Sequence, residues 1–178
     1  MKITLIRHGE SEANVGLFIN DDPKRPVHLT PRGKEQAESL AQTLRAETFT
    51  HAYVSEFPRA QETMNILLRG RSIPLRIDLR LNERKSGLDG FPVQVFINQI
   101  LHAPVHFKPA AGESFLEQME RLRGFLDEIA ALHPQAHVLA VSHEHPILSA
   151  LGLTSSAEAV VHGSVPNCGR VDLVWPPA

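Results

Sequence analysis

The feature that most constrains the fold is a short apolar run that ends in a cation, an imidazole and a glycine. Residues 2–6 (KITLI) are apolar and partly β-branched, which is typical of a strand buried within an α/β sheet. Arg7 and His8 follow this run directly. Because open α/β sheets bind ligands at the carboxyl ends of their strands, we expect Arg7 and His8 at a binding site. Gly9 permits a sharp turn there, since it has no Cβ atom.

An arginine beside a histidine suits chemistry on an anion. Neutral imidazole is a nucleophile, and its unperturbed pKa of about 6.5 leaves much of a histidine neutral at pH 7. The guanidinium of Arg7 is always protonated, and its fork of donors matches the oxygens of a phosphate. The alternative is that His8 only binds a backbone carbonyl beside a surface arginine. A dipeptide does not distinguish these two interpretations, but the longer segment does.

Residues 7–14 (RHGESEAN) closely resemble the opening motif of the histidine phosphatase superfamily, which includes the phosphoglycerate mutases. Later segments resemble further motifs of this superfamily in the same order, at Ser55 with Arg59-Ala60 and Thr63, at Glu83, at Gly112-Glu113-Ser114 and at His143. The resemblance extends over about residues 2–175. It implies a three-layer α/β/α fold with a mostly parallel sheet.

Three of these positions also have simpler interpretations. Arg59 is expected at a helix N-terminus, where free N–H groups and the helix dipole favour an anion, although such arginines often lie only on the surface. Glu83 has cationic neighbours in the sequence, which is compatible with ordinary surface ion pairs. His143 follows a buried strand and is compatible with pairing to a carbonyl or to Glu144. If its strand lies beside the first one, His143 faces His8.

The resemblance implies a two-step phosphoryl transfer. His8 attacks phosphorus and becomes phosphohistidine while Glu83 protonates the leaving oxygen, and Glu83 then deprotonates the water that releases phosphate. Four side chains are expected around the phosphoryl oxygens, where preorganised donors contribute strongly to the rate: Arg7, Asn14, Arg59 and His143. This mechanism requires no metal, because these cations replace a magnesium ion.

The hydrophobic patterns predict strands that alternate with helices. Strands are expected at 2–6, 51–55, 75–79, 137–142 and 170–175, and helices after Thr30, from Pro58, from Pro92, after Ser114, over 146–151 and over 156–161. This alternation favours an α/β domain with helices on both faces of a mostly parallel sheet. We expect one domain over residues 1–178, in which residues 87–112 cover the site and select the substrate.

A phosphatase is favoured over a cofactor-dependent phosphoglycerate mutase. The segment that contains Glu83 resembles the mutases, but Ser86 replaces their aromatic residue and the span from Glu83 to Gly112 is much shorter than theirs. Glu144 departs from the small residue that is usual after the second histidine. We expect its carboxylate close to the phosphate, where it narrows the substrate range or pairs with His145.

Two further alternatives remain open at this point. A catalytically inactive relative would only bind a phosphorylated partner, but His8 and Glu83 are both present. A phosphohistidine protein phosphatase is the second alternative, but the smallest of these enzymes lack the acid–base glutamate. Glu83 therefore indicates a phosphoric monoester hydrolase that acts on esters with poor leaving groups.

Composition restricts the partners and cofactors. The formal net charge of −2 gives no basic excess, which argues against nucleic acid or an anionic membrane as a partner. No run approaches the roughly 20 apolar residues of a membrane span. Cys168 is the only cysteine, and the spacing of His143 and His145 matches no standard zinc motif. We expect a soluble cytoplasmic protein without metal or other cofactor, acting on a small phosphorylated metabolite or, alternatively, a phosphoprotein.

Overall fold

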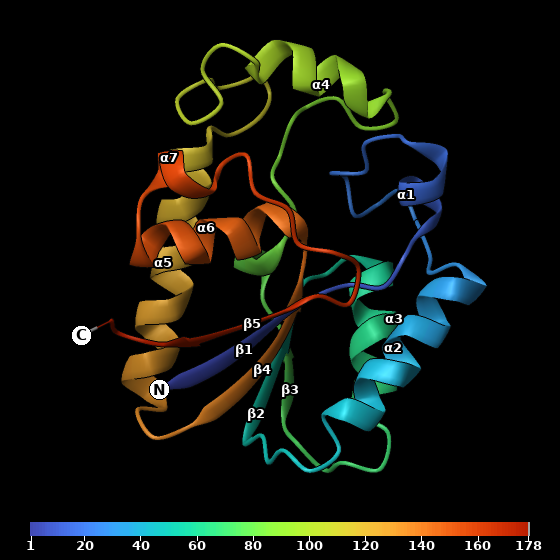
Figure 1. Ribbon diagram of the computed structural model, residues 1–178, viewed down its shortest axis with the longest axis vertical. Coiled ribbons are helices and arrows are strands. Elements are labelled where there is room, and N and C mark those ends of the chain that lie inside the picture. Colours follow the sequence, from blue (N-terminus) through green and yellow to red (C-terminus); the bar gives the residue numbers. More distant parts are fainter. Residues whose placement is uncertain (178) are drawn as a thin grey trace.

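The computed structural model, which describes residues 1–177, contains a five-stranded sheet with helices on both faces (Figure 1). The strand order is β3-β2-β4-β1-β5. The strands are β1 Lys2–Arg7, β2 His51–Val54, β3 Leu75–Ile77, β4 His137–Ser142 and β5 Arg170–Val174. The first four are parallel and β5 is antiparallel to β1. The predicted three-layer fold with a mostly parallel sheet is confirmed.

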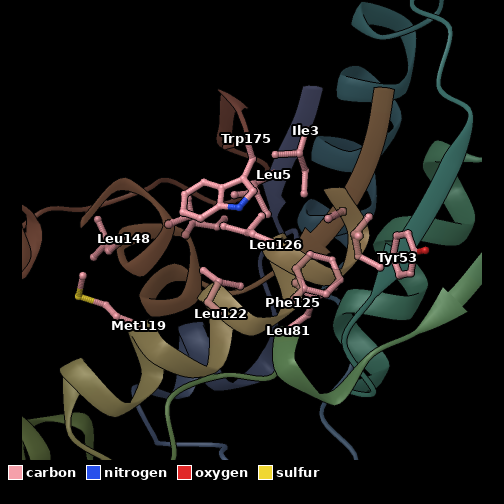
Figure 2. Close-up of a cluster of buried hydrophobic side chains, with 14 of the residues drawn as sticks. Ile3, Leu5, Tyr53, Leu81, Met119, Leu122, Phe125, Leu126, Leu148 and Trp175 are labelled. Atoms are coloured by element: carbon pink, nitrogen blue, oxygen red, sulfur yellow. The ribbon is translucent and has the colours of Figure 1, made fainter. Parts of the chain in front are cut away.

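Residues 3–6 of strand β1 are buried, which agrees with the apolar side chains that the strand places on both of its faces. Ile3 and Leu5 belong to the core beneath α5 (Phe115–Leu132), α6 (Glu144–Thr154) and α7 (Ala157–Val160), together with Leu122, Phe125 and Trp175 (Figure 2). Ile6 points into the opposite core, beneath α2 (Pro31–Thr43) and α3 (Pro58–Leu67). The alternation of the side chains along one strand thus joins both helical layers.

Two helices begin where the capping signals indicate. The hydroxyl of Thr30 accepts a hydrogen bond from the backbone N–H of Gly33 at 3.0 Å at the start of α2. The hydroxyl of Ser114 accepts from the N–H of Glu117 at 3.1 Å, and the Glu117 carboxylate accepts from the N–H of Ser114 at 2.9 Å. These contacts satisfy N–H groups that have no partner within the helix, and the second forms the predicted capping box.

Three elements differ from the sequence prediction. Residues Glu12–Gly16 form a short helix, α1, that the prediction missed. Strand β3 ends at Ile77 because the Asp78 carboxylate accepts a hydrogen bond from the N–H of Arg80, which starts the 3₁₀ helix Leu79–Leu81. Helix α6 begins at Glu144 and not at Pro146, since the third residue of a helix needs no N–H donor.

Helix α4 (Val93–Ile100) lies opposite α1 at one end of the molecule (Figure 1). The chain before it is tied to the chain after α1, because the N–H of Ile19 donates to the carbonyl of Phe91 at 2.8 Å and the N–H of Val93 donates to that of Leu17 at 3.0 Å. None of the helices in residues 1–177 is long and apolar enough to cross a membrane.

Candidate active site

The register of the two central strands brings His8 and His143 together. Arg7 of β1 is the Cα partner of Ser142 of β4, so the residue after each strand is a histidine on the same edge of the sheet. The two imidazole centroids are 5.1 Å apart with an edge-to-face geometry. The predicted neighbourhood of the two histidines is therefore confirmed.

His8 is held as a neutral imidazole whose lone pair lies on Nε2. Its Nδ1 lies 2.7 Å from the carbonyl oxygen of Gly9, so Nδ1 carries the proton and donates it. Its Nε2 accepts a hydrogen bond from Nε of Arg59 at 3.1 Å. Burial, followed by the charge of Arg59, holds the pKa of His8 well below its usual range. The tautomer and charge are those that a nucleophilic Nε2 requires.

Gly9 is required by close packing and not by its own backbone angles. A Cβ atom on Gly9 would lie 2.4 Å from the carbonyl oxygen of Gly33, near the start of α2. A Cβ atom on Gly33 would lie 2.0 Å from the carbonyl oxygen of Glu10. The two glycines therefore let the segment after β1 approach the N-terminal end of α2 at a distance that no side chain permits.

Arg59 connects the two histidines to the loop after α1. It lies in the first turn of α3, and its guanidinium donates to both the amide oxygen and, at 3.1 Å, the backbone oxygen of Asn20. It also contacts Nδ1 of His143 at 3.2 Å and stacks over the ring of Phe57 at 4.5 Å. Burial lowers its pKa to about 10, so the guanidinium stays positive at neutral pH.

His143 lies deeper than the sequence prediction implied. It is completely buried, and its Nε2 lies 2.7 Å from the hydroxyl of Ser55 while its Nδ1 accepts from Arg59. Burial and then the charge of Arg59 hold its pKa well below the usual range. Both ring nitrogens thus have protein partners, and contact of His143 with a phosphoryl group stays a prediction.

Arg7 and Glu144 form an ion pair beside the cavity. A terminal nitrogen of Arg7 lies 3.1 Å from the Glu144 carboxylate and donates to the carbonyl of Val165 at 2.5 Å. Glu144 also accepts from the N–H of Val165 and from the hydroxyl of Ser164. The expected pairing of Glu144 with His145 is wrong, because neighbouring residues on a helix point in different directions.

Asn14 is oriented by three donors. Its amide oxygen accepts from the N–H of Ser11 at 3.0 Å, from the Ser11 hydroxyl at 2.9 Å and from the side chain of Asn167 at 3.2 Å. The oxygen is therefore occupied, and the NH₂ group is the part of Asn14 that can donate to a ligand.

Five of the six predicted site residues line one cavity of about 280 Å³, namely Arg7, His8, Asn14, Arg59 and Glu83. His143 lies behind them. The opposite wall is apolar and includes Leu17, Phe18, Val93 and Phe96. A larger depression of about 700 Å³ shares Glu83 but is lined by several other carboxylates, among them Asp21, Asp89 and Glu113. These carboxylates would repel a phosphate, so the smaller cavity is the better site.

Glu83 follows the 3₁₀ helix Leu79–Leu81 and has two hydrogen-bond partners. One carboxylate oxygen lies 2.8 Å from the N–H of Arg84 and 3.2 Å from Nδ1 of His145. Burial raises the pKa of Glu83, but the charge and hydrogen bond of His145, with further help from His143, outweigh this effect. The net pKa lies well below its usual range, so Glu83 is ionised at neutral pH.

A comparison with protein-family models matches residues 3–176 to the histidine phosphatase superfamily (branch 1). The chain belongs to this superfamily. Among its curated relatives, the adenosylcobalamin/alpha-ribazole phosphatase of Escherichia coli (strain K12) is 32% identical over 91% of this chain and 84% of that protein. A Cronobacter sakazakii protein named "Probable phosphoglycerate mutase GpmB" is 29% identical over 97% of this chain and 85% of its own length.

A solved structure of a phosphatase is also similar to this chain. The alpha-ribazole phosphatase from Shigella flexneri superimposes with a TM-score of 0.85 at 27% sequence identity, covering 98% of this chain and 90% of that one. The resemblance to the histidine phosphatase superfamily that the motifs indicated is thus confirmed.

Sequence reasoning missed two side chains of this superfamily member's site, Asn20 and His145. Asn20 is 39 positions from Arg59, and His145 is 62 positions from Glu83, so no local pattern connects them. Phe96 is buried and also lines the cavity. Within residues 1–177 no three His, Cys, Asp or Glu side chains are grouped so that they could hold a metal ion.

Proposed function

We propose that this protein is a phosphatase that hydrolyses a phosphomonoester through a phosphohistidine on His8, with Glu83 as general acid and base. The observation that carries the proposal is the arrangement of these two side chains in one cavity. The imidazole of His8 is neutral, with its proton on Nδ1 and its lone pair on Nε2, and the carboxylate of Glu83 lines the same space. Nucleophile and acid–base group thus face one substrate.

In the first step, a bond forms between Nε2 of His8 and phosphorus while the bond from phosphorus to the ester oxygen breaks. Arg59, which donates to Nε2 in the free protein, is placed to donate to a phosphoryl oxygen instead. Arg7 and the NH₂ group of Asn14 supply further donors. Donors that are already held in place stabilise the charge of the transition state without reorganisation. In the second step, Glu83 takes a proton from the water that attacks the phosphohistidine.

The charges around the cavity favour a phosphatase over a phosphoglycerate mutase. A phosphoglycerate carries a carboxylate and needs a cation beyond those that hold the phosphate. Arg84 lines the cavity, but it is buried and its guanidinium donates to three backbone carbonyls, those of Pro104, Phe107 and Glu113. Among the described residues, the remaining arginines of the cavity are Arg7 and Arg59, which are assigned to the phosphate.

The cavity also supports a small substrate. A volume of about 280 Å³ fits a small phosphorylated metabolite with an uncharged part against the apolar wall, and a phosphoprotein is the less favoured alternative. We include in the proposal that residues 1–178 form one domain in which residues 87–112 cover the site, because Val93 and Phe96 line the cavity. A cytoplasmic location fits the presence of a single cysteine.

The test is hydrolysis of 4-nitrophenyl phosphate in the presence of a metal chelator. We expect turnover that the chelator does not reduce and that the His8→Ala variant loses. In the wild type, a base-quenched reaction analysed by mass spectrometry should contain an acid-labile phosphoryl group on His8. Turnover that persists in His8→Ala, or that disappears with the chelator, would refute the proposed mechanism.

A further inference from the structure

The acid–base glutamate lacks the proton that its first task requires. The leaving oxygen of an alkyl ester must be protonated as the phosphorus–oxygen bond breaks, yet Glu83 is ionised in the free protein. A nearby group must therefore supply the proton. The candidates are the groups that contact the Glu83 carboxylate, because a proton moves only between atoms within hydrogen-bond reach.

One titratable side chain in residues 1–177 is hydrogen-bonded to Glu83. Nδ1 of His145 lies 3.2 Å from a carboxylate oxygen of Glu83. The other donor to this oxygen is the backbone N–H of Arg84, which does not titrate. Histidine gains and loses a proton near neutral pH, so His145 is chemically suited to exchange one with Glu83.

The surroundings leave His145 free for this exchange. It lies in the first turn of α6 and lines the cavity, with about a third of its side chain exposed. The ring of Phe96 from helix α4 lies in an edge-to-face arrangement with His145, at a centroid distance of 6.4 Å. The neighbouring carboxylate, Glu144, is turned away to Arg7.

Other charged and titratable groups influence Glu83 without bonding to it. They come from the end of β1, from α3, from the segment after the 3₁₀ helix and from the end of β4, and they are His8, Arg59, Arg84 and His143. The two histidines have protein partners at both ring nitrogens. The arginines stay protonated at neutral pH. None of these four groups is therefore a suitable proton donor.

We propose that Glu83 and His145 share one proton and act together as the acid and base of the reaction, with His145 as the positioning residue that stores the proton. This inference rests on the proposed function. His145 begins the reaction as an imidazolium. In the first step, its Nδ1–H bond breaks, which leaves a neutral imidazole, and an O–H bond forms on the leaving alcohol, with the Glu83 carboxylate as carrier. In the second step, Glu83 takes one proton from the attacking water and passes it to Nδ1 of His145, which restores the imidazolium.

The test compares two substrates of similar size but different leaving groups. 4-Nitrophenolate leaves without protonation, whereas phenolate benefits from it. The variant is His145→Asn, whose amide nitrogen can replace Nδ1 as a donor to Glu83 but cannot titrate. We expect kcat/KM to fall about 100-fold for phenyl phosphate and about twofold or less for 4-nitrophenyl phosphate, in keeping with the usual size of general acid catalysis.

A second variant and a control complete the test. His145→Ala should show the same dependence on the leaving group with a larger loss, because Glu83 then also loses its orientation. His162→Asn replaces an exposed histidine that does not line the cavity, and it should leave both substrates unaffected. If His145→Asn lowers kcat/KM equally for both substrates, or lowers it for neither, the inference is overturned.

A failure of this inference can be distinguished from a failure of the proposed function. If His8→Ala abolishes turnover and His145→Asn lowers kcat/KM equally for both substrates, the phosphohistidine route stands and His145 has a purely structural role. If His8→Ala retains turnover, the route itself fails, whatever the variants of His145 show.

Discussion

The floor and the rim of the cavity are built in different ways. The floor consists of side chains at strand and helix ends. His8 and Arg59 line it, and His143 lies directly behind them. All three are almost completely buried, and Arg59 is hydrogen-bonded to both histidines. The rim consists of α1, α4 and the chain beside them, where large apolar side chains are exposed. Leu17 is 69% exposed and Leu101 is 61% exposed.

This difference indicates that the floor and the rim contribute to catalysis in different ways. Buried and mutually bonded groups hold a fixed geometry, which is what stabilisation of a transition state requires. The exposed apolar side chains of the rim can contact the substrate, and the strength of these contacts depends on which substrate is bound. We therefore expect changes in the floor to reduce turnover of every substrate, and changes in the rim to alter KM for particular ones.

The largest effect is expected in the floor, from Arg59→Lys. Lysine keeps the charge but loses the fork that bonds Asn20, His8 and His143 at once. Loss of such donors typically lowers kcat by about 100- to 1,000-fold. Steady-state kinetics on 4-nitrophenyl phosphate measures this, with Arg69→Lys on the exposed side of the molecule as the matched control. A loss below tenfold would show that the fork is dispensable.

The buried histidines of the floor should also make the stability of the folded protein depend on pH. His8 and His143 have pKa values well below those of the unfolded chain, so below about pH 6.5 the unfolded state binds more protons than the folded state. Stability is therefore complete above this pH and decreases as the pH falls. Two such histidines lower the free energy of unfolding by up to about 2.7 kcal/mol per pH unit.

Urea unfolding at pH 7.5, 6.0 and 5.0 measures this slope. The His8→Asn variant should show about half of it, because one of the two buried imidazoles is gone. A slope that is unchanged in this variant would place the pH dependence elsewhere in the molecule.

A smaller effect is expected where the floor meets α2. Gly9→Ala introduces a Cβ atom 2.4 Å from the carbonyl oxygen of Gly33, and such overpacking destabilises by about 1–3 kcal/mol. Gly124→Ala is the matched control, because a Cβ atom there meets nothing within 4 Å and lies in helix α5. The control should gain up to about 1 kcal/mol from helix propensity. Equal stabilities of the two variants in urea would contradict the packing argument.

The smallest effect is expected in the rim, from Phe96→Leu. This change shortens the apolar wall of the cavity without adding a polar group. We expect KM to rise a few-fold for aryl phosphates, equivalent to about 1 kcal/mol, with kcat nearly unchanged. The exposed Ile97 is the control, and Ile97→Ser should leave both constants unchanged. A fall in kcat without a change in KM would assign Phe96 to the floor instead.

Much of the fold follows from local patterns in the sequence. Thr30 and Ser114 begin helices because their hydroxyls reach backbone N–H groups three residues ahead. Strand β1 is predicted to be buried because Ile3, Leu5 and Ile6 form a short apolar, partly β-branched run that only Thr4 interrupts. The boundaries of β3 and α6 were predicted less well, since the Asp78 cap and the tolerance of a helix for Pro146 depend on backbone geometry that alternation does not encode.

Local sequence patterns and motifs indicated the superfamily, the alternation of strands and helices, and six candidates for one site: Arg7, His8, Asn14, Arg59, Glu83 and His143. Which side chains face one another depends on the tertiary structure. The pairing of Arg7 with Ser142 in register sets the two histidines side by side, and Glu83 meets His145 across 62 positions of chain. Capping and periodicity act over a few residues, whereas these contacts exist only once the sheet order has brought distant strand ends to the same edge.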